Sequence, residues 1–221
     1  DWYFTEEQTE KCKKLLQKFS AVSVREFDGV EKCRKFFDKD AIHLVDPTLL
    51  LDKEDYEKLI EKANVLTDKK GCFLNYILDL NKASETNSDF ITSVLGREAV
   101  MANSRSEDAN AQNYSLEERI APSVEDWLNS FACADFVFTD SFHGCVFSII
   151  FNKPFLVFLN KDRGLSRFTS LLKAFELENR IVSSDHDELI RQINAPINWE
   201  RVNIIKSFEK EKALNFLRNN L

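Results

Sequence analysis

Residues 134–159 read ADFVFTDSFHGCVFSIIFNKPFLVFL. The pattern predicts a strand over Phe136–Thr139 and a short apolar helix from about Gly144 to Phe151. After a break at 152–154 it predicts a second strand over Phe155–Leu159. An uninterrupted apolar strand of this kind is typical of a parallel sheet that is buried on both faces.

Strands and helices alternate on both sides of this segment. The other expected strands are Ala21–Val24, Ile42–Val45, Cys72–Leu78 and Ile181–Val182. Expected helices carry apolar stripes around Cys12–Phe19, Val30–Phe37, Tyr56–Ala63, Val124–Phe131, Phe168–Phe175, Asp185–Ile193 and Trp199–Leu221. The polar segments 81–93 and 103–113 are interpreted as loops around a weak helix or strand. This alternation predicts an α/β fold with a Rossmann-like, doubly wound parallel sheet.

The composition is that of a globular protein. The 221 residues are 43% hydrophobic and 30% charged, which argues against disorder. A net charge of −7 argues against a general nucleic-acid binder. No apolar run approaches the ~20 residues that span a bilayer, and no signal peptide is recognisable. The opening at Asp1, without a methionine, predicts a fragment of a longer protein or a processed chain.

Cysteine spacing and missing motifs argue against several kinds of site. The five cysteines are scattered and form no CxxC pair, so a disulfide framework and a zinc site are both disfavoured. No dinucleotide-binding, Walker, HExxH or GxSxG pattern occurs.

In doubly wound folds, ligands bind beyond the carboxyl ends of the strands. One such loop reads Asp140-Ser141-Phe142-His143-Gly144. Its glycine permits a tight turn, the following helix start offers free N–H groups to an anion, and His143 can exchange a proton near neutral pH. The alternative is structural: Asp140 and Ser141 cap the helix, and His143 bonds locally.

The loop after Leu159 carries Lys161, Arg163 and Arg167 before the next helix, for which Ser166 is the expected cap. Cations at a helix amino terminus oppose the helix dipole, so an anionic ligand explains them better than stability does. The alternative is a solvated surface loop with Asp162 paired to a neighbour.

Arg25 follows the first expected strand and could grip a carboxylate or phosphate. Spacing alone favours a structural pair with Glu26 or Asp46 instead, and Asp28 is the expected cap of the next helix. His43 lies inside an expected strand, which favours a structural role. His186 lies in a polar cluster typical of the surface.

Several of these motifs together resemble the polysaccharide pyruvyl transferase family. The resemblance rests on residues 134–144 and 147–155, on Arg163–Phe168, and on three shorter motifs in family order: Ser23–Glu26, Asp46–Leu50 and Asp126–Leu128.

The resemblance implies two Rossmann-like domains, as in GT-B glycosyltransferases. Residues 1–51 would be the tail of the amino-terminal domain. Residues 52–221 would be the carboxy-terminal donor-binding domain, with a final crossing helix.

It further implies transfer of pyruvate from phosphoenolpyruvate to sugar hydroxyls as a ketal, in polysaccharide biosynthesis such as that of a capsule or exopolysaccharide. His143 would be the catalytic acid, Arg25, Ser141, Gly144, Lys161, Arg163 and Arg167 would bind substrate, and no metal or organic cofactor would be needed. We expect Arg25, Arg163 and Arg167 to converge with His143 on one pocket. Some family members carry Arg at the position of Ser141. If that Arg binds phosphate in them, Arg163, Arg167 or Lys161 must do so here.

The expected partners are phosphoenolpyruvate and a saccharide or lipid-linked oligosaccharide, in the cytoplasm or at the inner face of the membrane. One alternative is a GT-B enzyme with a nucleotide-sugar donor, for which Glu176 or Glu178 could bind a ribose. Another is a non-catalytic α/β fragment that lacks its partner domain.

Overall fold

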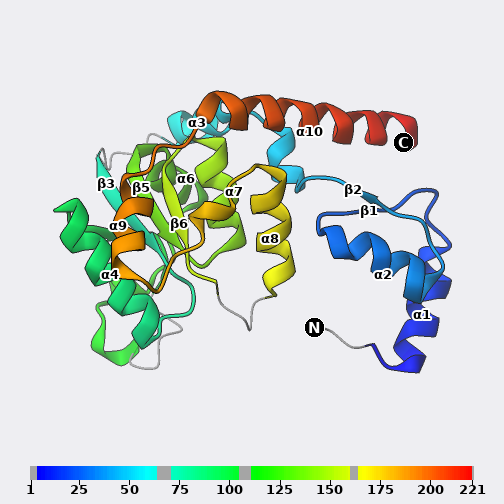
Figure 1. Ribbon diagram of the computed structural model, residues 1–221, viewed down its shortest axis with the longest axis horizontal. Helices are drawn as coiled ribbons and strands as arrows, with labels where there is room; N and C mark the ends of the chain where they lie inside the picture. The colour runs from blue at the N-terminus through cyan, green and yellow to red at the C-terminus, as the bar shows by residue number, and fades with distance from the viewer. Residues whose placement is uncertain (1–3, 64–70, 105–110, 160–163, 221) are drawn as a thin grey trace. The chain divides into compact units, whose positions relative to one another are not determined.

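A computed structural model describes residues 4–63, 71–104, 111–159 and 164–220. The chain forms two compact units (Figure 1). Unit 1 comprises residues 1–50, 160–178 and 198–221, and unit 2 comprises 51–159 and 179–197. Both units therefore combine segments that are distant in sequence. The predicted domain boundary between residues 51 and 52 stays a prediction.

Unit 2 contains a sheet of four parallel strands in the order β4-β3-β5-β6. The strands are β3 (Cys72–Tyr76), β4 (Ala99–Met101), β5 (Ala134–Thr139) and β6 (Phe155–Val157). The prediction of an α/β fold with parallel strands is confirmed. The expected strand at Ile181 is a single parallel bridge to Val157.

Helices cover both faces of this sheet. On one face, α4 (Lys82–Leu95) and α9 (His186–Asn194) contribute Ile91, Leu189 and Ile193 to a buried core with strand side chains such as Phe138. Against the other face lie α6 (Val124–Cys133) and α7 (Phe142–Ile150). The unit also contains α3 (Lys53–Lys62), α5 (Leu116–Arg119) and the 3-10 turn Ala111–Asn113. A further 3-10 turn, Glu178–Arg180, begins at the last residue of a unit 1 segment and continues into unit 2.

The polar segment 81–93 belongs to the full helix α4, where the sequence predicted a loop around a weak element. Asn81 caps the helix: its side chain accepts from the backbone N–H groups of Ala83 and Ser84. The inward face includes the buried residues Ser84 and Ser88, with Ile91 below them. Because serines occupy buried positions, the sequence lacks the apolar periodicity by which an amphipathic helix is recognised.

Arg180 is the largest fully buried side chain of the described residues, with 1% of its surface exposed. One of its terminal nitrogens donates to the backbone oxygens of Gln192 and Ala195, 3.2 Å away in each case. Burial lowers the pKa of this guanidinium. The side chain therefore satisfies carbonyls at the end of α9, where a cation also complements the helix dipole.

We expect Arg180→Ala to lower the free energy of unfolding by about 3–5 kcal/mol, through the cavity and the orphaned carbonyls. Urea unfolding monitored by circular dichroism measures this. Arg191→Ala removes an exposed arginine from α9 and should leave the midpoint unchanged. Equal midpoints for the two variants would contradict the role given to Arg180.

Unit 1 contains a parallel pair of short strands, β1 (Ser23–Val24) and β2 (Ile42–His43). Both strands are shorter than predicted. The helices are α1 (Glu6–Leu16), α2 (Phe27–Phe37), α8 (Leu165–Ala174) and α10 (Trp199–Asn220), with a 3-10 turn at Pro47–Leu50 against which α10 packs.

Two expected helix caps are wrong. The residue before α2 is Glu26, and the residue before α8 is Gly164 at φ 79°, a left-handed angle that suits glycine. The predicted caps Asp28 and Ser166 instead bond to each other: the Ser166 hydroxyl donates to the Asp28 carboxylate at 2.7 Å. Asp28 and Ser166 therefore form a hydrogen bond across unit 1 in place of the helix caps that local sequence rules predict.

His43 is packed in unit 1, as the structural interpretation predicted. Its ring stacks on Phe27 with centroids 3.9 Å apart. Burial lowers its pKa below the ordinary 6.5, and the positive charge of Lys212 adds to that shift. The nearby acids Glu209 and Glu26, and a backbone hydrogen bond involving Arg25, act in the opposite direction but do not reverse it.

This lowered pKa predicts a pH dependence of stability. As the pH falls below about 6.5, the unfolded chain protonates this imidazole more readily than the folded chain, so the free energy of unfolding decreases. The loss continues until the pH passes the folded pKa. We expect His43→Gln to reduce the difference between urea midpoints at about pH 7.5 and about pH 5.5. An unchanged difference would show that other groups set this dependence.

Candidate functional site

The segment that contains the end of β5, the following turn and α7 is buried except for one histidine. From Phe136 to Phe151, His143 is the only exposed residue, and every other residue is buried. It is the second residue of α7. The residues around it are fixed by packing, so the imidazole stands on a rigid base.

The hydroxyl of Thr139 holds the turn that leads to His143. It donates to the Tyr76 carbonyl at 2.7 Å and accepts from the Ser141 N–H at 3.0 Å. The Ser141 side chain in turn accepts from the Gly144 N–H at 3.3 Å. Ser141 is therefore the cap of α7, as the structural interpretation of the sequence proposed.

Asp140 has a role that sequence patterns did not reveal. Its buried carboxylate accepts from the N–H groups of Leu78, at 2.7 Å, and Asp79, at 3.0 Å. It thereby ties the turn after β3 to the start of α7. The partners are backbone groups some sixty positions away, which no side-chain motif can signal.

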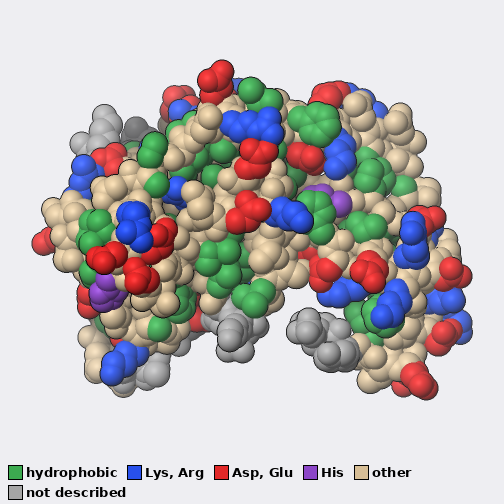
Figure 2. Space-filling view, in the orientation of Figure 1, with side chains coloured by type: hydrophobic (Ala, Val, Ile, Leu, Met, Phe, Trp, Pro, Cys, Tyr) green, Lys and Arg blue, Asp and Glu red, His purple; other side chains and the backbone are tan. Residues whose placement is uncertain are grey.

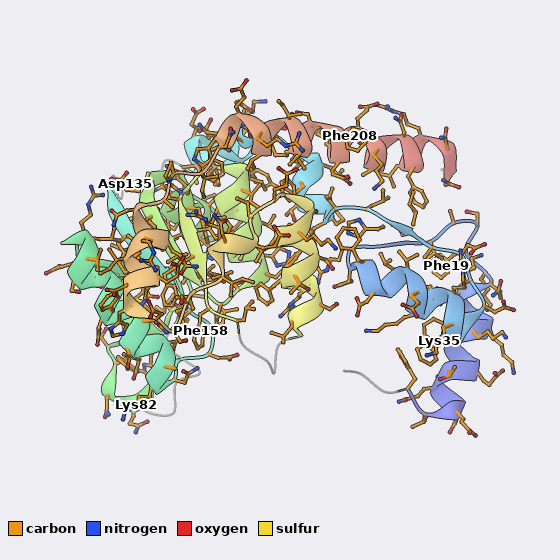
Figure 3. The ribbon with its side chains drawn as sticks, viewed as in Figure 1. Phe19, Lys35, Lys82, Asp135, Phe158 and Phe208 are labelled. Carbon is orange, nitrogen blue, oxygen red and sulfur yellow. The ribbon has the colours of Figure 1, made fainter. Side chains whose placement is uncertain are left out.

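These turns lie at the carboxyl edge of the sheet. In Figure 3, Asp135 near the start of β5 and Phe158 just after β6 lie at opposite edges. Phe158 donates its N–H to the Thr139 carbonyl at 2.8 Å, so the end of β6 lies beside the loop that bears His143. This is the edge at which doubly wound folds bind ligands.

Gly144 allows α7 to approach β5 closely. A Cβ at this position would lie 2.3 Å from the Thr139 hydroxyl oxygen and 2.9 Å from its Cβ and Cγ2. Any side chain here would push the helix start away from the strand, so the glycine is required by the packing.

In unit 1, Arg25 and Arg167 line one pocket of about 270 Å³. The other lining residues are Glu26, Asp28, Gly29, Lys32, Gly164 and Ser166. Arg25 also makes both of the structural pairs that its spacing suggested. Its guanidinium donates to Asp46 at 2.6 Å and to Glu26 at 3.3 Å. Burial lowers the pKa of Arg25, but the two carboxylates outweigh burial and raise it overall.

Other predicted residues fall elsewhere. Lys161 and Arg163 lie outside the described residues. His143 belongs to unit 2, and its convergence with the arginines stays a prediction. His186 is exposed, and its ring stacks on Phe90. Glu176, a candidate ribose acceptor, is paired with Arg201, which lowers the pKa of this carboxyl.

Comparison with known families decides the classification. The family model described as polysaccharide pyruvyl transferase matches residues 1–162.

The chain belongs to the polysaccharide pyruvyl transferase family.

The match to the pyruvyl transferase family includes Arg25, Ser141, His143, Gly144 and Lys161. Arg163 and Arg167 lie beyond it, so the interpretation of these two arginines rests on the motif and position alone. Comparison with curated proteins gives no match.

Two solved structures resemble this pyruvyl transferase family member, and both are of the wall teichoic acid polymerase TagF. One, soaked with CDPG, has 15% identity and a TM-score of 0.44, over 98% of this chain and 63% of that chain. The other has 14% identity and a TM-score of 0.42, over 97% and 63%. The present chain thus spans 63% of the length of these solved chains.

Two features are absent from the described residues. No helix among them is long and apolar enough to cross a membrane. They also contain no group of three or more His, Cys, Asp or Glu placed to hold a metal ion.

We expect Gly144→Ala to lower the free energy of unfolding by about 1–3 kcal/mol, because the added methyl overlaps Thr139. Gly29→Ala is the matched control in another helix, where the new Cβ would lie 3.2 Å from Val24. Denaturant unfolding of both variants tests this. If Gly144→Ala costs no more than Gly29→Ala, the close approach does not constrain α7.

Proposed function

We propose that this protein transfers pyruvate from phosphoenolpyruvate to sugar hydroxyls, forming a ketal during polysaccharide synthesis. Family membership supports a transferase of this class. The observation that carries the proposal is the single exposed residue His143 on an otherwise buried strand-turn-helix support. A proton donor needs this combination of access and fixed position.

In this reaction His143 acts as the general acid. Its imidazolium gives a proton to the methylene carbon of the enol phosphate, while a sugar hydroxyl adds to the adjacent carbon and loses its own proton to a base. A second hydroxyl then displaces phosphate from that carbon and passes its proton to the departing phosphate, which closes the ketal and releases inorganic phosphate. Phosphoenolpyruvate itself supplies the leaving group, so the proposed reaction needs no organic cofactor.

Substrate binding is assigned to Arg25, Ser141, Gly144, Lys161, Arg163 and Arg167. Phosphoenolpyruvate is strongly anionic, whereas the chain carries a net charge of −7, so cations must gather locally. The start of α7 adds backbone N–H groups at the carboxyl edge of the sheet. In this proposal, residues 52–221 form the donor-binding domain.

The acceptor is a saccharide, free or lipid-linked. We place the reaction in the cytoplasm or at the inner face of the membrane, where lipid-linked intermediates of a capsule or exopolysaccharide are assembled. The whole protein that carries this chain is the correct object for a turnover assay.

We expect His143→Ala in that protein to lower turnover about 10²–10⁴-fold, the usual contribution of a positioned acid. The urea midpoint should change little, because the side chain is exposed. Phosphate release from phosphoenolpyruvate, measured with a panel of glycosides, reports turnover.

His186→Ala removes another exposed histidine of the same unit and should keep wild-type turnover. Full activity in His143→Ala would exclude this residue as the acid. Transfer from nucleotide-sugars, without phosphate release from phosphoenolpyruvate, would favour the glycosyltransferase alternative.

A further inference from the structure

Four aromatic rings meet in unit 2 where α6 packs on the sheet and on α7. They belong to Tyr76 of β3, Trp127 and Phe131 of α6, and Phe147 of α7, and we call them the Trp127 cluster. The centroid of the Trp127 ring lies 4.8 Å from that of Phe147 and 5.6 Å from that of Tyr76, both edge to face. Phe131 and Phe147 are buried, whereas Trp127 and Tyr76 are partly exposed. Two buried rings therefore hold two accessible rings in place.

The Trp127 cluster lies near the carboxyl edge of the sheet. Tyr76 is the last residue of β3 and pairs with Thr139 at the end of β5. Helix α6 packs on both strands and runs directly into the start of β5, so its first turn lies at the carboxyl edge. Trp127 is the fourth residue of α6, and helical side chains lean toward the amino terminus of their helix. The indole is therefore directed toward the edge at which doubly wound folds bind ligands.

His143 lies one helical turn from this cluster. His143 and Phe147 are four positions apart on α7, so they share one face of that helix, with Cβ atoms ~5–6 Å apart. The Phe147 ring contacts Trp127, and α6 packs on α7. The exposed imidazole therefore extends from the face of α7 that is turned toward α6. A ligand that rests on the accessible part of Trp127 lies next to the proposed acid.

The indole N–H of Trp127 is available to such a ligand. No described residue accepts a hydrogen bond from this N–H, and its nitrogen is not buried. A tryptophan held in an aromatic cluster usually donates its N–H to a partner within the protein. Here the ring is fixed by packing, while its single donor is left for an acceptor oxygen from outside.

This arrangement does not suit phosphoenolpyruvate. The faces of aromatic rings carry partial negative charge, so they do not attract an anion. In Figure 2, acidic and basic side chains lie intermingled around α4 and α9, so the visible face of unit 2 has no broad field of one sign that would draw an anion. The donor therefore depends on local cations, and the Trp127 cluster contains none.

A sugar ring meets the opposite situation. The C–H groups on one face of a pyranose carry partial positive charge and pack favourably on an aromatic ring. The hydroxyl or acetamido oxygens on its rim can accept a hydrogen bond from an indole N–H. Small-molecule sites typically combine such aromatic walls with a few placed polar groups.

We propose that Trp127 and Tyr76 bind the sugar ring of the acceptor that reacts at His143, with the Trp127 indole N–H donating to one of its oxygens. This inference deepens the proposed function and rests on it for the term acceptor. The saccharide-binding property itself stands on the aromatic rings and the available N–H.

Trp127→Phe keeps an aromatic ring and removes the N–H. We expect this variant of the whole protein to bind methyl glycosides of hexoses or N-acetylhexosamines about three- to tenfold more weakly, the value of one neutral hydrogen bond. Calorimetric titration measures this. In turnover assays the KM for the acceptor should rise by the same factor, whereas kcat and the KM for phosphoenolpyruvate should stay at wild-type values. Trp199→Phe changes a partly exposed tryptophan of unit 1 and is the matched control.

NMR of the wild-type protein provides a measurement that does not depend on turnover. The indole N–H signal that is absent from Trp127→Phe should shift when a glycoside is added, and the signal of Trp199 should not. Urea unfolding checks each fold. If Trp127→Phe does not fold, Tyr76→Leu and Tyr76→Phe replace it, because only the first removes a ring, and only the first should lose saccharide affinity.

Wild-type saccharide affinity in Trp127→Phe would overturn the inference, as would a panel in which no glycoside binds or in which nucleosides bind more tightly than glycosides. A lower kcat with unchanged saccharide affinity would overturn it too, because Trp127 would then only support His143. A glycoside that shifts the Trp127 signal, in a protein that releases no phosphate from phosphoenolpyruvate, would retain this inference and reject the proposed function.

Discussion

The side chain of Thr139 against the backbone of Gly144 is the contact on which the site of unit 2 depends. One hydroxyl satisfies the Tyr76 carbonyl and the Ser141 N–H, and so joins β3, the end of β5 and the cap of α7. The helix can approach because Gly144 has no Cβ. The Asp140 carboxylate also accepts two hydrogen bonds from backbone N–H groups of the turn after β3, and so fixes that turn to the same loop. The direction of His143 follows from these constraints, since the rest of residues 136–151 is buried.

Sequence patterns predicted the features that arise from local periodicity. The apolar runs of 134–159 gave the correct order of strand, helix and strand, and the parallel α/β fold follows from their alternation. Helix α4 was missed because Ser84 and Ser88 occupy its buried face. The caps at Asp28 and Ser166 were wrong because these residues bond across unit 1 instead of along their own helices.

The same limit applies to the candidate site residues. A histidine at the end of a strand could be selected from the sequence, whereas the bonds of Asp140 to a distant turn could not. For Arg25, spacing proposed two carboxylate partners as alternatives, and the structure shows both. Partners brought together by the fold decide whether a cation serves a ligand or its neighbours, and a single sequence does not specify them.

The discontinuous make-up of unit 1 affects how the chain is made. Residues 4–50 share that unit with 160–178 and with α10 at 199–220, which packs on the turn Pro47–Leu50. A ribosome adds about 5–20 residues per second, so the early segment waits roughly ten seconds or more before this helix emerges. During that wait α2 lacks its later contacts with α8, and the turn Pro47–Leu50 lacks α10. Unit 1 therefore cannot be complete until synthesis passes α10.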